Sequence, residues 1–130
     1  KGTTNPTLSH LVDLMPTILE ATQSSPSEFP ADKKRMAWDG RSILPALTGK
    51  KQADPAVLFF HHARGKAIRV GNWKLVLNKD GKKKAKWELY DLSVDPNELK
   101  DLANSQTNKV KELVQLWESK EKEFKERSSL

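Results

Sequence analysis

The side chains best suited to chemistry lie in one short stretch, which carries His61, His62, Arg64 and Lys66. Imidazole, guanidinium and ammonium groups donate hydrogen bonds, and the two cations attract anions, so this stretch could contact an anionic ligand. If the histidines lie on a strand, one faces the packed side of the sheet and the other faces solvent or a cleft. A histidine at a strand end is more often a hydrogen-bonded structural residue, and the two cations equally suit a solvated turn.

The rest of the chain contains no recognisable catalytic or metal-binding pattern. The third histidine is His10, no H-x-x-x-H spacing occurs, and cysteine is absent. Disulfides, thiolate metal sites and a cysteine nucleophile are therefore excluded. A glycine-rich phosphate loop, a nucleophile elbow and a serine with an identifiable base are also missing. We predict no catalytic residue and no metal site within these 130 residues.

The strands that would position the histidines are predicted from Val57 onward. The segments "VLFFHH", "KAIRV", "WKLVLN" and "KWELYDL" are rich in aromatic and branched residues and are separated by glycine-containing turns. Gly71-Asn72 suits a tight two-residue hairpin. The next connection starts at Asp80-Gly81, and its lysines indicate a solvated tip that discourages edge-to-edge association of sheets. These lysines are Lys82, Lys83, Lys84 and Lys86.

A C-terminal helix is predicted to cover this sheet. It should run from about Asn108 toward Lys125, because apolar residues form one stripe and lysines and glutamates fill the opposite face. The stripe consists of Val110, Leu113, Val114, Trp117 and Phe124.

The strand aromatics Trp73, Trp87 and Tyr90 allow two interpretations. Beside the lysines they could stack on the bases of single-stranded nucleic acid. Strand aromatics more often belong to a core, and Trp117 on the covering helix supplies a partner for them. Core packing is therefore preferred, and no nucleic-acid partner is predicted.

Elements of the first half are predicted to be short. A helix should start near Asp13 and reach Thr22, because Pro16 then falls in the first turn, where a missing N–H costs nothing. Its apolar residues are Leu11, Leu14, Met15, Ile18 and Leu19.

Residues 23–35 read as an exposed loop, and "WDGRSILPALTG" predicts one or two helical turns that end at Gly49. In the second half, Asp95-Pro96-Asn97-Glu98 has the pattern of a capping box that opens a short helix.

The bulk properties fit a folded domain of modest size. The chain has 130 residues, a formal charge of +6 and a pI near 9.6. This charge favours anionic partners such as sulfated sugars or nucleic acid without choosing among them. No apolar run is long enough to span a bilayer, so no membrane association is predicted. Because the first residue is Lys1, we expect the chain to be part of a longer protein.

Four segments, in this order and with these gaps, resemble the C-terminal part of the formylglycine-dependent sulfatases of the arylsulfatase type. They are "SHLVDLMPTILEAT", "WDGRSILPALTG", "KAIRVGNWKLV" and "WELYDLSVDPNELKDLAN". The resemblance implies an α+β fold, with a small antiparallel sheet of about four strands and a C-terminal helix packed on it. Residues 1–55 would join this subdomain, residues 56–130, to an N-terminal catalytic α/β domain. The apolar stripe of the first helix would pack on that domain, so we expect the chain alone to self-associate.

The resemblance also implies sulfate-ester hydrolysis by the full-length enzyme. Its nucleophile would be a hydrated formylglycine, made from cysteine or serine in a C-x-P-S-R or S-x-P-x-R motif, beside a calcium ion. Neither motif occurs in this chain, so we expect the chain alone to be inactive. A sulfated small molecule or glycan would be the substrate, and the family implies a periplasmic, secreted or lysosomal protein.

The family places the rim of the substrate pocket between Phe60 and Lys66. His62 is the first candidate for a substrate contact, followed by His61, Arg64 and Lys66, because His62 lies nearer the turn. The alternatives are a stand-alone basic module that binds sulfated polysaccharide or nucleic acid, and a purely structural domain that holds its partner domain folded.

Overall fold

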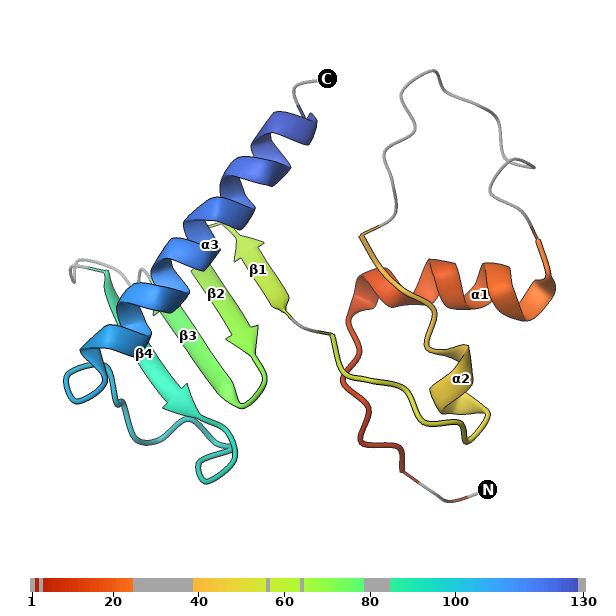
Figure 1. Ribbon diagram of the computed structural model, residues 1–130, viewed down its shortest axis with the longest axis horizontal. Helices are drawn as coiled ribbons and strands as arrows, with labels where there is room; N and C mark the ends of the chain where they lie inside the picture. The colour runs from red at the N-terminus through yellow and green to blue at the C-terminus, as the bar shows by residue number, and fades with distance from the viewer. Residues whose placement is uncertain are drawn as a thin grey trace. The chain divides into compact units, whose positions relative to one another are not determined.

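Four antiparallel strands and a long helix form the second half of the chain, and short helices with extended connections form the first half (Figure 1). The computed structural model describes residues 2, 4–24, 39–55, 57–63, 65–78 and 85–128. The chain divides into a first unit, Lys1–Pro55, and a second unit, Ala56–Leu130.

The sheet of the second unit is a meander in which each strand pairs with the next one along the chain. Val70 and Trp73 form the last pair of the second hairpin, so Gly71-Asn72 is its two-residue turn, as predicted. Gly71 has a φ of 57°, a left-handed conformation that glycine adopts without strain. The strands are β1 (Leu58–His62), β2 (Gly65–Val70), β3 (Trp73–Asn78) and β4 (Lys86–Asp91).

Helix α3 (Thr107–Ser128) lies across one face of this sheet (Figure 1). The core forms between them, and its central side chains are at most 1% exposed: Ile68, Leu75, Leu89, Leu113 and Trp117. Burying each of these side chains is worth about 1.5–3 kcal/mol, which is why the apolar stripe of the helix predicts its packed face. The α+β fold and the covering helix are therefore confirmed.

The connection between β4 and α3 corrects one prediction, because no helix opens at Asp95. Its carboxylate accepts hydrogen bonds from the backbone N–H groups of Leu99 and Lys100, at 3.1 and 2.8 Å. Glu98 has a φ of 58°, which turns the chain out of the right-handed helical path. The acceptor at Asp95 thus organises a tight loop where the sequence pattern predicts a helix start.

A second carboxylate fixes the end of the same connection against the edge of the sheet. One oxygen of Asp101 accepts from the backbone N–H groups of Leu89 and Ala103, at 3.1 and 2.8 Å. Leu102 N–H donates to the carbonyl of Leu89 at 2.8 Å. The outer edge of β4 is therefore partly covered by the chain that follows it, which limits pairing with other strands.

The first unit contains a 3-10 turn, η1 (Leu11–Asp13), followed by α1 (Leu14–Thr22) and the short α2 (Leu44–Leu47). Pro16 lies in the first turn of α1, as expected. Asp13 occupies the N-cap position without capping the helix by its side chain. Its carboxylate instead accepts from the backbone N–H groups of His10 and Arg41, at 2.7 and 2.9 Å, and so joins two segments of this unit.

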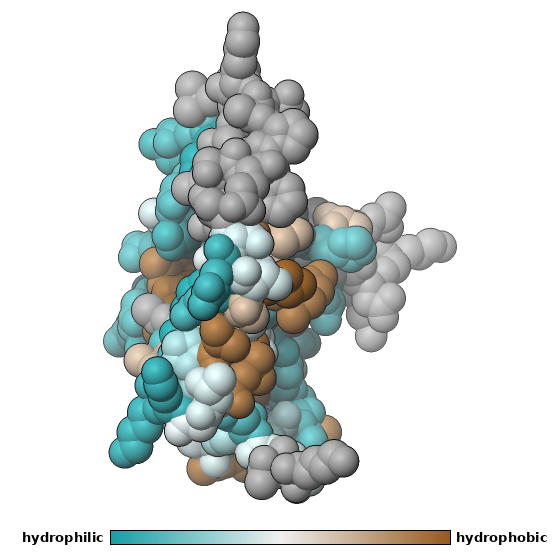
Figure 2. All heavy atoms as spheres, turned by 90° about the vertical axis from the view of Figure 1, so that its right-hand side faces the viewer, coloured by the Kyte–Doolittle hydropathy of each residue, from teal (hydrophilic) through white to brown (hydrophobic). Residues whose placement is uncertain are grey.

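The apolar stripe of α1 is only partly covered. Leu19 is buried, whereas the other predicted members of the stripe are open to solvent, and apolar surface is visible on this unit in Figure 2. These exposed residues are Leu11, Leu14, Met15 and Ile18. Thr17, on the covered side, accepts a hydrogen bond from Ile43 N–H at 3.0 Å. The side of α1 that packs within the unit therefore combines the buried side chain of Leu19 with this polar contact of Thr17.

Residues 25–35 of the predicted exposed loop and the lysines at 82–84 lie outside the described residues. In the parts of the chain that are described, no helix combines the length and apolar character needed to cross a bilayer.

Candidate functional site

The candidate site residues gather around the turn of the first hairpin. His62 and Gly65 form its last strand pair, and His61 faces Lys66 one pair further from the turn. Ala63, in the turn, has a φ of 49°. Arg64 lies outside the residues that the structure describes. The hairpin therefore places His61, His62 and Lys66 at its turn end.

His61 and Lys66 both turn toward α3. The Nδ1 atom of His61 lies 3.5 Å from Oε1 of Glu121, and Nζ of Lys66 lies 3.7 Å from the same oxygen. Both residues also contact Trp117. The ammonium group of Lys66 lies 4.0 Å from the centroid of the Trp117 ring, and the His61 ring meets it edge-on, with the two ring centroids 5.4 Å apart. We call His61, Lys66, Trp117 and Glu121 the hairpin clasp.

His62 belongs to the opposite face of the sheet. Successive strand residues alternate between faces, and both Phe59 and His61 contact Trp117 on α3. His62 is exposed. The expectation that the two histidines face opposite sides is confirmed, and among the described candidates His62 is the one that does not take part in the clasp.

A polar network lies on the same face as His62, toward β3 and β4. The hydroxyl of Tyr90 donates to Oε2 of Glu88 at 3.0 Å, and Lys74 forms an ion pair with Glu98. Burial, followed by this hydrogen bond and the charge of Glu88, raises the pKa of Tyr90 to about 12. These groups satisfy one another, so they support the fold of the face rather than form a reactive centre.

The strand aromatics belong to the interior, as preferred from the sequence. Trp73 and Trp87 pack against the core cluster, and the ring of Trp87 lies 6.1 Å from that of Trp117. Tyr90 is also buried but lies on the other face of the sheet, because its neighbour Leu89 occupies the core. Trp117 is therefore a partner of Trp87 and not of Tyr90. These rings do not form an open platform for stacking bases.

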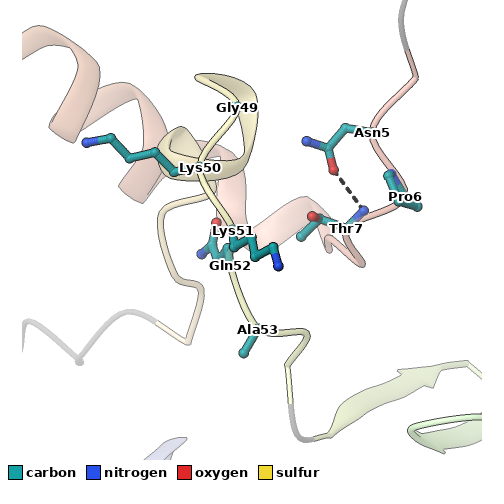
Figure 3. Close-up of a pocket in the computed structure, with 8 residues that line it drawn as sticks. All are labelled: Asn5, Pro6, Thr7, Gly49, Lys50, Lys51, Gln52 and Ala53. Carbon is teal, nitrogen blue, oxygen red and sulfur yellow. Dashed lines mark hydrogen bonds between the residues drawn. The ribbon is translucent and has the colours of Figure 1, made fainter.

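The first unit has a hollow of about 500 Å³, lined by residues 5–7 and 49–53 (Figure 3). Asn5 accepts a hydrogen bond from Thr7 N–H at 2.9 Å and donates to the carbonyl of Ala46 at 2.6 Å. These bonds fix the path of the chain beside the hollow. Lys50 and Lys51 are exposed on its rim, and solvated lysines alone do not select a ligand, so we assign the hollow no function.

The resemblance implies calcium and formylglycine for a full-length enzyme, and the described residues offer no ligand set for the calcium ion. In the described part of the chain, no group of three or more histidine, aspartate or glutamate side chains is placed to hold a metal ion. Cysteine, one precursor of formylglycine, is absent from the sequence. We therefore derive no reaction step from these residues.

The sequence interpretation missed the role of Glu121. A signal for it existed, because Glu121 follows Trp117 by four residues and therefore lies on the same face of the helix. The sequence pattern predicts that the glutamates and lysines of this helix lie on its solvated face, and most of them do. The partners of Glu121 come from β1 and β2, which helical periodicity does not specify.

Known proteins similar to this chain are sulfatases. An uncharacterised sulfatase of Schizosaccharomyces pombe is 41% identical over 124 residues, which cover 82% of this chain and 20% of the relative. An N-acetylglucosamine-6-O-sulfatase of Bacteroides thetaiotaomicron is 30% identical, over 96% of this chain and 23% of the relative. The chain thus spans about a fifth of the length of these curated relatives. No protein-family model matches it.

Solved structures share the fold. BT4656 in complex with its substrate, D-glucosamine-2-N,6-O-disulfate, matches with a TM-score of 0.61 and 25% identity, over 88% of this chain and 24% of that one. A sulfatase structure from work on glycosaminoglycan metabolism by Bacteroides thetaiotaomicron has a TM-score of 0.61 and 26% identity, over 82% of this chain and 24% of that one. On these similarities of sequence and fold, the chain belongs with the sulfatases, as a counterpart of their C-terminal part.

Proposed function

We propose that this chain serves an enzyme that hydrolyses sulfate esters, and that its β1–β2 hairpin end borders the substrate pocket of that enzyme. The observation that carries the proposal is the similarity to sulfatases over most of the chain, at 41% and 30% identity. The nucleophile and the metal ligands would belong to a catalytic domain outside these residues. The chain by itself is therefore expected to have no sulfatase activity.

A sulfated amino sugar is the substrate class that we propose. One relative is named as an N-acetylglucosamine-6-O-sulfatase, and one structural neighbour was solved with a disulfated glucosamine. Sulfate is an anion, and sugar hydroxyls are hydrogen-bond donors and acceptors. A histidine at the pocket rim suits such a ligand, because its ring nitrogens can donate to sulfate oxygens or bond to hydroxyls.

His62 is the residue of this chain that we propose as the substrate contact. Its position on the face away from α3 supports this choice, because both histidines are exposed and only His61 is engaged by α3. His61 and Lys66, by contrast, already share Glu121 and Trp117 as partners. These two residues would have to leave the clasp in order to reach a ligand on the other face of the sheet.

The test is His62→Ala in the sulfatase that carries this sequence, assayed with a 6-O-sulfated glucosamine. Losing one well-placed polar contact should lower kcat/KM by roughly tenfold to a hundredfold, equivalent to about 1.5–3 kcal/mol. Lys122→Ala is the control, since the side chain of Lys122 is 78% exposed on α3. Unchanged kinetics in a normally folded His62→Ala enzyme would leave His62 as scaffold.

Binding measurements on the 130-residue chain separate this proposal from a stand-alone basic module. Heparin and single-stranded DNA are titrated across a series of salt concentrations. A basic binding site would show affinity that falls steeply with salt for both polymers. We expect only weak binding, because Trp73, Trp87 and Tyr90 are packed against the rest of the fold and do not form a stacking surface beside the lysines.

A further inference from the structure

Helix α3 holds both strands of the β1–β2 hairpin next to its turn. Oε1 of Glu121 lies 3.5 Å from Nδ1 of His61 and 3.7 Å from Nζ of Lys66, and these two residues face each other across the strand pair. The other oxygen of Glu121 lies 3.3 Å from Nζ of Lys125, one helical turn further along. A single carboxylate therefore links the helix to two neighbouring strands.

The clasp is anchored in the core as well as by charge. Trp117 is 1% exposed, so its ring is fixed by the packing around it. The ammonium group of Lys66 lies over this ring, and a cation over the face of tryptophan is attracted by the ring electrons. The indole N–H of Trp117 donates to the carbonyl of Phe60 at 3.4 Å, which ties β1 to the same side chain.

Glu121 differs in this respect from other glutamates of the helix. Glu112 pairs with Lys109 and Glu123 pairs with Lys120, and both pairs stay within α3 at a spacing of three residues. The side chain of Glu121 is only 19% exposed, whereas that of Glu112 is 59% exposed. Exposed pairs within one helix contribute little to structure elsewhere. Glu112 is therefore a matched control for Glu121.

We propose that Glu121 is a positioning residue, which sets the place of His62 by holding His61 and Lys66 against α3. The inference rests on the proposed function, since it takes His62 as the substrate contact. His62 follows His61 directly and pairs with Gly65, so a shift of the clasped strand pair moves His62 with it. A displaced contact weakens substrate binding, while the chemical step on residues outside this chain is unaffected.

The kinetic test compares Glu121→Gln with Glu112→Gln in the whole sulfatase. Glutamine keeps the shape of the side chain and removes its charge. For Glu121→Gln we expect KM to rise roughly five- to tenfold with kcat nearly unchanged, and for Glu112→Gln we expect no change. If Glu121 acts through His62, the Glu121→Gln/His62→Ala double variant should be no worse than His62→Ala alone. Additive losses would overturn the positioning role.

A measurement on the 130-residue chain tests the same role without substrate. Amide hydrogen exchange at the hairpin end, residues 61–66, should speed up roughly tenfold in Glu121→Gln and stay unchanged in Glu112→Gln. Unaltered exchange in Glu121→Gln would overturn the positioning role whatever the kinetics show. If His62→Ala alone leaves KM unchanged while exchange responds as expected, the substrate contact fails and the clasp stands.

Discussion

Adjacent residues of one strand have opposite surroundings in this protein. His61 contacts the core tryptophan and a carboxylate of α3, whereas His62 lies on the other face, although both are exposed. The difference follows from the pleat of the strand, which sends successive side chains to opposite sides of the sheet. A search for functional groups by residue type alone would treat the two histidines as equivalent.

Tyr90 provides a test of its surroundings, because it is the one tyrosine of the chain. Absorbance at the phenolate band should show Tyr90 titrating near 12 in the folded chain, against 10.0 ordinarily. Between these two pKa values, Tyr90 keeps its phenolic proton in the folded chain and loses it in the unfolded chain. The stability that this group contributes is therefore complete below pH 10 and decreases as pH rises toward 12.

Glu88→Gln is the matching variant for Tyr90. It removes the negative charge beside the phenol but keeps a side-chain oxygen that can accept the hydroxyl hydrogen bond. The pKa of Tyr90 should fall in this variant and remain above its ordinary value, since burial is the larger cause of the shift. An unchanged titration curve would show that the charge of Glu88 has no influence on Tyr90.

Asp101 predicts a loss of stability in acid. Burial alone would raise its pKa, but hydrogen bonds from Ala103 N–H and Leu89 N–H, with Lys86, outweigh burial and lower the pKa below 3.8. The carboxylate therefore contributes stability above pH 3.8, which is lost as pH falls through the lowered pKa.

Asp101→Ala should destabilise the chain by about 2 kcal/mol at neutral pH, because two backbone donors lose their acceptor.

Urea unfolding at neutral and acidic pH measures this effect. Asp101→Asn is the control, since its amide oxygen can still accept from both N–H groups. We expect Asp101→Asn to keep most of the stability and to depend less on pH than the parent chain. Equal stability of Asp101→Ala and the parent would show that water replaces the carboxylate without cost.

Among the elements, the first unit depends on a close approach between η1 and the segment before α2. Arg41 N–H reaches the carboxylate of Asp13, and Ile43 N–H reaches the hydroxyl of Thr17. Gly40 lies where this segment meets the turn. A Cβ atom at Gly40 would stand 2.0 Å from the backbone carbonyl oxygen of Val12, so no side chain fits there without a shift of the main chain.

Gly40→Ala should therefore destabilise the first unit by about 2 kcal/mol or more, because the atoms it meets belong to the backbone. Amide chemical shifts and hydrogen exchange would report the change at η1 and α1. Gly65→Ala is the comparison, since its Cβ would make ordinary contacts of 3.5 and 3.6 Å. Equal tolerance of both substitutions would contradict the close approach at Gly40.

At the scale of the whole molecule, the apolar stripe along η1 and α1 is one apolar surface that the chain leaves open. Leu11 is 77% exposed, and Leu14, Met15 and Ile18 are each more than 40% exposed. Contiguous apolar surface of this kind marks an interface or promotes association. Such a stripe is what the resemblance to sulfatases leads us to expect, since it implies that the catalytic domain packs on this helix.

The 130-residue chain is therefore expected to self-associate as its concentration rises. Sedimentation velocity over a range of concentrations should show dimers or larger species. A variant with Leu14→Lys and Ile18→Lys should remain monomeric, because two charges interrupt the stripe. A parent chain that stays monomeric throughout would show that the stripe is covered in solution.

The sequence by itself determined the strands, the turn at Gly71, the course of α3 and the burial of Trp117. Period-two and period-3.6 patterns specify which face of an element is apolar, and burial of that face is the largest favourable term in folding. The prediction of a helix at Asp95 was wrong, because an aspartate side chain that accepts backbone hydrogen bonds can stabilise a tight loop as well as a helix start.

Only the tertiary structure decided which residues meet across elements. Periodicity places Glu121 beside Trp117 on α3, but the strand register and the path of the helix across the sheet bring it to His61 and Lys66. The same geometry turned His62, not His61, away from the clasp. Long-range contacts of this kind depend on how whole elements pack, and the local sequence around each residue does not contain that information.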